Sequence, residues 1–142
     1  MAEASSGQPA RERPLSPHLQ IYRPEINMVM SVFHRLTGVA LYFGALLLAW
    51  WLFAAATNAQ YFAFVNGLFA TWFGMVVLVG FSWALLHHML GGLRHLVWDT
   101  GSNLDITSVD VLSWATIIGS LLLTAALWLY IAAERGWIAA WQ

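Results

Sequence analysis

The chain has 142 residues, of which 60% are hydrophobic and only 9% are charged, and its formal net charge is -1. A soluble domain carries about 25% charged residues, so this composition predicts an integral membrane protein and excludes an ordinary soluble enzyme. The absence of cysteine excludes disulfides, thiol catalysis and iron–sulfur ligation by this chain. At this length we expect no catalytic head domain beside the membrane segments.

Residues 1–26 read as a polar N-terminal tail followed by a segment that we expect to lie at the inner membrane surface. The tail has no apolar core of the kind that a signal peptide needs. Three prolines, Pro14, Pro17 and Pro24, favour an extended conformation before the first membrane helix.

Residues 27–142 form the expected membrane domain, with three predicted spans at about residues 27–56, 66–97 and 110–133. Each span holds about 20 apolar residues, the length that an α-helix needs to cross the hydrocarbon core. Helices satisfy their own backbone hydrogen bonds in lipid, so the predicted fold class is all-α. Short connectors join the spans, and the run from Thr107 to Asp110 resembles a capping box at the start of the third.

The distribution of arginine predicts the orientation in the membrane. Five of the six arginines fall on the side of the N-terminus and the second connector, and one falls on the opposite side: Arg11, Arg13, Arg23, Arg35 and Arg94 against Arg135. The positive-inside rule then places the N-terminus and the second connector in the cytoplasm or the mitochondrial matrix. Of the two we expect the cytoplasmic membrane of a bacterium, with the N-terminus in the cytoplasm, in preference to the mitochondrial inner membrane. The polar ends of the first two spans lie together at this inner side.

A polar stripe opens the first span. Ser31, His34, Arg35 and Gly38 are spaced i, i+3, i+4 and i+7, so they share one helix face. A hydroxyl beside an arginine could hydrogen-bond a quinone carbonyl, and the arginine could pair with a haem propionate. The alternative is an interfacial arginine that reaches the lipid headgroups, with His34 facing water.

A second polar cluster ends the second span, after a run from Gly67 to Leu86 without any charge. His88, His95 and Asp99 share one face, and Gly91 and Gly92 remove side chains beside them. His88 lies about 16 Å along the helix from Asp99, near the middle of the membrane, which suits a ligand of b-type haem iron. His95 lies about 10 Å nearer the inner surface, within reach of a propionate.

The neighbouring histidine, His87, is rotated about 100° from His88, and we expect it to make an interhelical hydrogen bond instead. The third span contains no histidine, and its polar residues form a stripe for helix packing: Ser113, Thr116, Ser120 and Thr124. We expect His34 to lie too close to the inner surface to face His88. A six-coordinate haem would then need a histidine from another chain.

Three motifs together resemble those of the cytochrome b large membrane-anchor subunits of succinate dehydrogenase (complex II), of the alphaproteobacterial and mitochondrial type. They are RPLSPHLQIY at residues 13–22, SVFHRLTG at residues 31–38, and HxxxGxRHxxxD at residues 88–99. The resemblance covers about residues 13–133 and includes the order of the three spans. It implies three membrane helices that form half of a heterodimeric helix bundle.

The same resemblance implies roles for single residues. His88 would be an axial ligand of haem b iron, Ser31 and Arg35 would line the ubiquinone site, and His34, Arg35 and His95 would lie near the haem propionates. It gives no clear role to Asp99 and none to His87. Haem b would be shared with a second, small anchor subunit that supplies the other ligand, and ubiquinone would be the substrate.

The function implied is that of a membrane anchor in succinate:ubiquinone oxidoreductase, beside an iron–sulfur subunit and a flavoprotein subunit. The chain itself would not oxidise succinate, because it has no flavin-binding motif. One alternative is the anchor of a fumarate reductase, which runs the reaction in reverse. Another is a structural or transport helix bundle without a cofactor.

Overall fold

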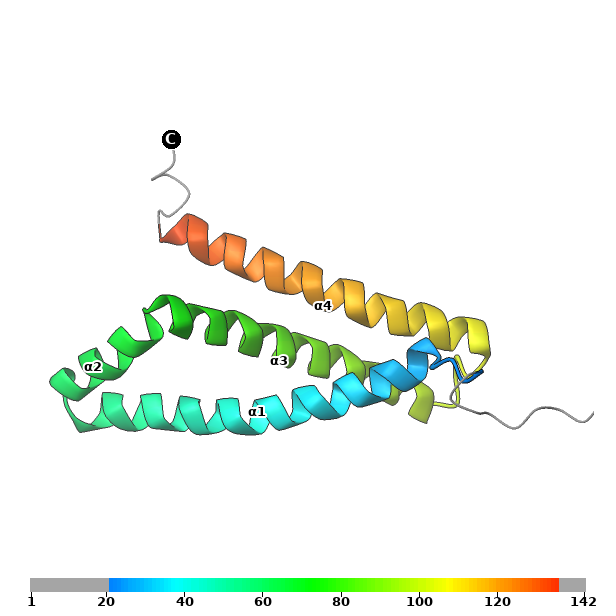
Figure 1. Ribbon diagram of the computed structural model, residues 1–142, viewed down its shortest axis with the longest axis horizontal. Helices are drawn as coiled ribbons and strands as arrows, with labels where there is room; N and C mark the ends of the chain where they lie inside the picture. The colour runs from blue at the N-terminus through cyan, green and yellow to red at the C-terminus, as the bar shows by residue number, and fades with distance from the viewer. Residues whose placement is uncertain (1–20, 136–142) are drawn as a thin grey trace, which may run out of the picture.

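The computed structural model describes residues 21–135, which form four helices. They are α1 (Ile26–Thr57), α2 (Ala59–Phe69), α3 (Trp72–Asp99) and α4 (Ile106–Glu134) (Figure 1). The three long helices α1, α3 and α4 have the length and apolar composition to cross a membrane. The predicted all-α fold with three spans is therefore confirmed. The expected segment before the first span lies mostly outside the described residues.

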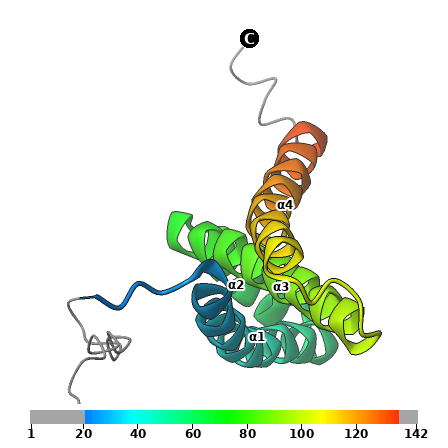
Figure 2. The ribbon, with the colours of Figure 1, turned by 90° about the vertical axis from the view of Figure 1, so that its right-hand side faces the viewer.

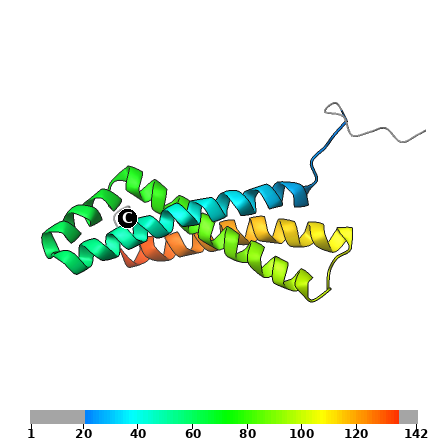
Figure 3. The same ribbon diagram turned by 90° about the horizontal axis from the view of Figure 1, so that it is seen from below.

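The chain passes along α1, reverses direction through the short α2, and returns along α3. It then reverses again and follows α4. Helix α3 lies between α1 and α4, and α2 closes the end where α1 and α3 join (Figure 1). Seen end-on, α4 leans away from the pair formed by α1 and α3 (Figure 2). Seen from below, α1 and α3 cross each other (Figure 3). The start of α1 and the end of α3 lie at the same end of the molecule, opposite α2 (Figure 1).

Helix α2 occupies the predicted connector between the first two spans together with the first residues of the predicted second span. The second long helix begins at Trp72 instead of about residue 66. Two side-chain caps explain where α2 and α3 begin. The side chain of Asn58 accepts a hydrogen bond from the backbone N–H of Tyr61 at 2.8 Å, which starts α2. The hydroxyl of Thr71 accepts one from the backbone N–H of Gly74 at 3.1 Å, which starts α3.

The start of α4 also differs from the predicted capping box at Thr107–Asp110. The helix is capped by Asp105, whose carboxylate accepts a hydrogen bond from the backbone N–H of Ser108 at 2.9 Å. Thr107 lies inside the first turn, and the helix therefore begins at Ile106. This bond lowers the pKa of the Asp105 carboxyl, since it favours the charged form.

The interior of the bundle is more polar than its outer surface, as expected when lipid is the solvent. The stripe predicted for helix packing on α4 is buried in the bundle: Ser113, Thr116, Ser120 and Thr124. Large apolar side chains such as Leu121, Leu122 and Tyr130 point outward. Small residues let membrane helices approach closely, and van der Waals packing with interhelical hydrogen bonds then holds them together.

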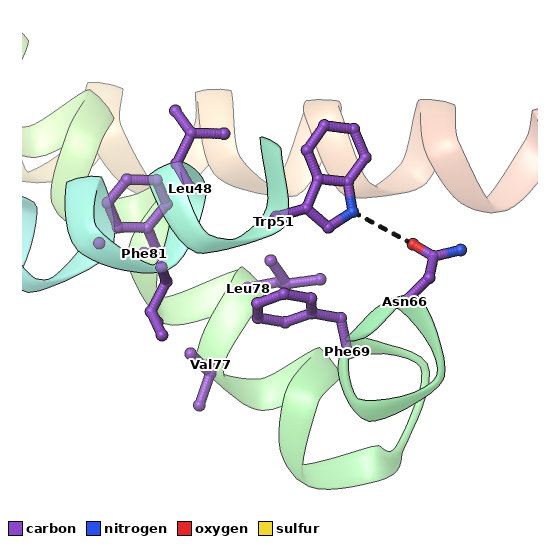
Figure 4. Close-up of a pocket in the computed structure, with 9 residues that line it drawn as sticks. Leu48, Trp51, Asn66, Phe69, Val77, Leu78 and Phe81 are labelled. Atoms are coloured by element: carbon purple, nitrogen blue, oxygen red, sulfur yellow. Dashed lines mark hydrogen bonds between the residues drawn. The ribbon is translucent and has the colours of Figure 1, made fainter. Parts of the chain in front are cut away.

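An apolar cavity of about 320 Å³ lies at the closed end, between α1, α2 and α3. Its walls include Leu48, Phe69, Leu78 and Phe81. At its edge the indole N–H of Trp51 donates a hydrogen bond to Oδ1 of Asn66 at 3.4 Å (Figure 4). The predicted functional residues that line a cavity, Ser31, Arg35 and His95, lie at the opposite end of the bundle. We call it the inner end, because the distribution of arginine predicts that it faces inward.

Candidate functional site

The rings of His34 on α1 and His88 on α3 stack on each other, with centroids 4.0 Å apart and planes 16° apart. The expectation that His34 is too shallow to face His88 is therefore wrong. Helices α1 and α3 cross at this level. His34, although it lies near the start of α1, therefore contacts His88, which lies well inside α3.

The environment of His88 determines which of its nitrogens carries the proton. Its Nδ1 lies 3.1 Å from the backbone carbonyl oxygen of His34 and 3.3 Å from the hydroxyl of Thr37. A carbonyl oxygen only accepts, so Nδ1 is the N–H donor of the neutral ring. The other ring nitrogen, Nε2, keeps its lone pair. Metal-binding histidines are held in this way, with the second nitrogen donating to a carbonyl.

Two glycines make room for the stacked pair. A Cβ at Gly91 would collide with the ring of His34, and one at Gly38 would lie 3.1 Å from Cε1 of His88. The missing side chain of Gly91 therefore leaves room for the His34 ring. Gly92 differs, because a Cβ there would meet nothing within 4 Å.

His87 faces the other way, into the contact between α3 and α4. It is only 2% exposed, and its Nδ1 lies 3.2 Å from the hydroxyl oxygen of Ser120. Since that hydroxyl donates to the carbonyl of Ile117 at 2.9 Å, His87 is the donor of the bond to Ser120. The predicted interhelical hydrogen bond of His87 is confirmed.

Arg94 was not among the predicted site residues, and the structure buries it at 5% exposure. Its guanidinium donates to Ser113 at 3.0 Å and lies 4.9 Å from the centre of the Trp98 ring. No carboxylate of residues 21–135 forms an ion pair with it. Its spacing of seven from His87 places both on the α4 side of α3, and this spacing could have revealed it.

His95 and Asp99 lie at the inner end of α3, and both are exposed. The His95 ring meets the ring of His34 edge-on at 5.4 Å and that of Trp98 at 5.1 Å. His95 thus joins the histidine cluster, whereas Asp99 forms no hydrogen bond or ion pair with it in the described part of the chain.

An open cavity of about 780 Å³ lies at the inner end, against the start of α1 and the end of α3. Ser31, Arg35 and His95 all line it, so the structure brings three predicted site residues to one cavity. Asn27 and Trp98, which were not predicted, line it as well. The cavity has the size of small-molecule sites, and its walls mix apolar surface with a few hydrogen-bonding groups.

Within the described residues, no group of three or more histidines and carboxylates converges on a point where a metal ion could sit. Instead, Nε2 of His88 and Nε2 of His87 each keep a lone pair, because Nδ1 of each ring is the donor. Nε2 of His87 and Nε2 of His34 are closed to solvent and have no hydrogen-bond partner within residues 21–135. A single imidazole lone pair suits a metal whose other ligands come from outside the cluster, such as a macrocycle.

These features define a class: a helical multi-pass membrane protein with a cluster of histidines and arginines at one end of its bundle. The family described as succinate dehydrogenase/fumarate reductase transmembrane subunit matches residues 9–127. The chain belongs to this family, as a membrane cytochrome b subunit of succinate dehydrogenase (complex II).

Relatives in several organisms are named as cytochrome b subunits of succinate dehydrogenase. The succinate dehydrogenase cytochrome b556 subunit of Paracoccus denitrificans is 43% identical over 123 residues, which cover 87% of this chain and 92% of the relative. That of Rickettsia felis is 40% identical, with 82% of this chain and 91% of the relative covered. The cytochrome b560 subunit of Marchantia polymorpha is 39% identical, with 68% and 74% covered.

Proposed function

We propose that this chain holds one side of a haem b through Nε2 of His88, and that Ser31 and Arg35 form part of a ubiquinone-reduction site. The observation that carries the proposal is the hydrogen bond from Nδ1 of His88 to the carbonyl of His34. It leaves Nε2 as a neutral donor to iron, which brings no charge into the membrane. The names of the relatives, which are cytochromes b, support the same cofactor.

The second axial ligand comes from outside this chain in our proposal. A metal lies in the plane of each imidazole that binds it, and two parallel rings stacked 4.0 Å apart share no such point within bonding distance. His34 therefore cannot complete the site with His88. His87 points toward α4, which has no histidine. The missing ligand would come from a small second anchor subunit, and the two anchors would together form one helix bundle.

The propionates of such a haem would find their partners at the inner end of the cluster. His34 has a buried Nε2 without a partner in residues 21–135, and His95 lies 5.4 Å from it, ring to ring. Arg35 adds a permanent charge one residue along α1. These three side chains are the ones that we assign to the propionates. When bound, haem b would supply a one-electron carrier in this region.

The inner cavity suits a quinone, because a quinone offers only acceptor oxygens at its ring. The hydroxyl of Ser31 and the guanidinium of Arg35 are donors on one face of α1, and both line the cavity. The cavity lies at the end of the bundle that we place inside, so protons for quinone reduction would arrive from that side. An iron–sulfur subunit docked over Ser31 and Arg35, carrying the flavoprotein, would deliver the electrons.

The relatives reported above are succinate dehydrogenase subunits, which favours succinate oxidation over the reverse reaction of a fumarate reductase. They also favour a cytochrome over a helix bundle without a cofactor. We place the N-terminus in the cytoplasm of a bacterium, since Arg23, Arg35 and Arg94 lie at the inner end. Arg11 and Arg13 lie outside the described residues.

The test of the haem site compares two adjacent histidines in the assembled complex. His88→Leu removes the proposed ligand, so we expect the low-spin b-type spectrum of the dithionite-reduced complex to be lost or altered. His87→Leu removes a hydrogen bond to Ser120 and should leave that spectrum in place. Loss of the spectrum in His87→Leu with an intact spectrum in His88→Leu would show that the ligand is assigned wrongly.

A further inference from the structure

We propose that Thr37 is a positioning residue for the iron ligand, setting the electron donation of His88 through a hydrogen bond to its Nδ1–H. This inference rests on the proposed haem site. It concerns a residue for which neither the motif spacing nor the cavity suggests a role. Thr37 lies one turn beyond His34 on α1 and is 3% exposed.

The hydroxyl of Thr37 donates its hydrogen to the backbone of its own helix. Its oxygen lies 2.8 Å from the backbone carbonyl of Phe33 and 3.0 Å from that of His34. Both are acceptors, so the hydroxyl hydrogen points back along α1. The lone pairs of the oxygen are then left for Nδ1 of His88, which lies 3.3 Å away.

The Nδ1–H of His88 is therefore shared between two acceptors on the same turn of α1, the Thr37 hydroxyl and the His34 carbonyl. An imidazole whose N–H is accepted more strongly becomes a stronger donor at its other nitrogen. A stronger donor stabilises ferric over ferrous iron and lowers the reduction potential. In a low-dielectric interior such a bond is felt more strongly than in water.

The backbone of α1 also limits how the His88 ring can turn. Gly38 passes so close that an added Cβ would lie 3.1 Å from Cε1 of His88. The ring of His34 covers one face of the His88 ring at 4.0 Å. Thr37, Gly38 and the His34 carbonyl thus form a seat, which we call the His88 seat, that presents Nε2 in one direction.

The experiment measures the haem midpoint potential in the whole assembled complex. Thr37→Val keeps the branched shape and removes the acceptor, so the potential should become more positive. We expect a change of about threefold to tenfold in the ferrous-to-ferric equilibrium, and tenfold is about 59 mV for one electron. Thr37→Ser restores the oxygen and should bring the potential back toward the wild-type value.

The matched control is Thr116→Val on α4. Thr116 is equally buried, at 4% exposure, and its hydroxyl donates to the carbonyl of Leu112 at 2.8 Å. It forms no hydrogen bond with a histidine of residues 21–135. Its replacement removes the same groups and should leave the potential unchanged. An equal shift in both variants would mean a general packing effect and would overturn the inference.

Two outcomes separate this inference from the proposed haem site. If His88→Leu removes the haem signal but Thr37→Val keeps the wild-type potential, the haem site stands and the role of Thr37 is wrong. If His88→Leu leaves the signal intact, the haem site itself is wrong. Should Thr37→Val fail to assemble, Gly38→Ala retains the hydroxyl and presses on the His88 ring. A potential and optical spectrum unchanged by that substitution would overturn the His88 seat.

Discussion

At the scale of single residues, function depends on which way two neighbouring side chains point. His87 and His88 are adjacent in sequence, yet one donates to Ser120 on α4 and the other to the carbonyl of His34 on α1. Each bond uses Nδ1–H, and each ring therefore carries its lone pair on Nε2. Only His88 is partly exposed, and this difference in access is what makes it the candidate ligand.

The quinone role of the inner cavity is tested at Ser31 and Arg35. Ser31→Ala removes one hydrogen bond, worth about 0.5–1.5 kcal/mol. The KM for a ubiquinone analogue should therefore rise by about two- to tenfold. Replacement of Arg35 by Gln should have the larger effect, since it also leaves any propionate partner unpaired.

The measurement compares quinone reduction with succinate oxidation by an artificial dye in the same complex. Dye reduction should persist in both variants, because it needs neither residue. Ser82→Ala serves as a control, because Ser82 donates to the carbonyl of Leu78 and lines a cavity at the opposite end. Equal loss of both activities with the complex intact would count against the quinone role.

At the scale of elements, capping side chains decide where each helix begins. Asn58, Thr71 and Asp105 each accept a hydrogen bond from the backbone N–H three residues later. Asn58 and Thr71 cap α2 and α3, so the predicted connector and the predicted second span are divided differently in the structure. Their residue types are those that favour N-caps, so they could have been recognised in the sequence. They were not recognised because the residues between them are mostly apolar and resemble part of a membrane span.

The cap at Asp105 makes the start of α4 sensitive to acid. Its pKa is lowered by the bond from Ser108, so this contribution to stability is present above the ordinary value of 3.8. It is lost as pH falls through the lowered pKa. Hydrogen exchange at the Ser108 amide, corrected for intrinsic rates, should therefore speed up in strong acid.

The variant Asp105→Asn separates the cap from its charge. The amide oxygen still accepts the bond, so the protection of Ser108 should no longer depend on pH in this range. A pH dependence that survives in Asp105→Asn would assign it to another group.

At the scale of the whole molecule, the chain would supply half of the proposed haem site. His88 is the one iron ligand that we propose, and α4 contains no histidine. The inner end also holds buried polar atoms that have no hydrogen-bond partner in residues 21–135, among them Asn27 Oδ1 and Arg94 Nε. Buried polar groups of this kind carry a cost unless a partner satisfies them. We therefore expect an obligate complex with the second anchor and the iron–sulfur subunit.

Expression of the chain alone tests this expectation. The single chain should insert into the membrane and fail to hold a six-coordinate haem, as judged by its optical spectrum. A stable low-spin haem in the purified single chain would contradict it, unless two copies pair through their His88 side chains. Crosslinking and mass measurement of the same sample distinguish a monomer from such a pair.

Composition and spacing determined the class of protein, the three membrane helices, the polar stripe of α4 and the separate direction of His87. These properties follow from local chemistry, because hydropathy sets the spans and the helical repeat sets which residues share a face. The tertiary structure decided what depends on how helices cross: the stacking of His34 on His88, the burial of Arg94 against Ser113, and the contact of Thr37 with His88. The depth of a residue along its own helix does not determine its neighbours on another, since the crossing of α1 and α3 sets which turns meet.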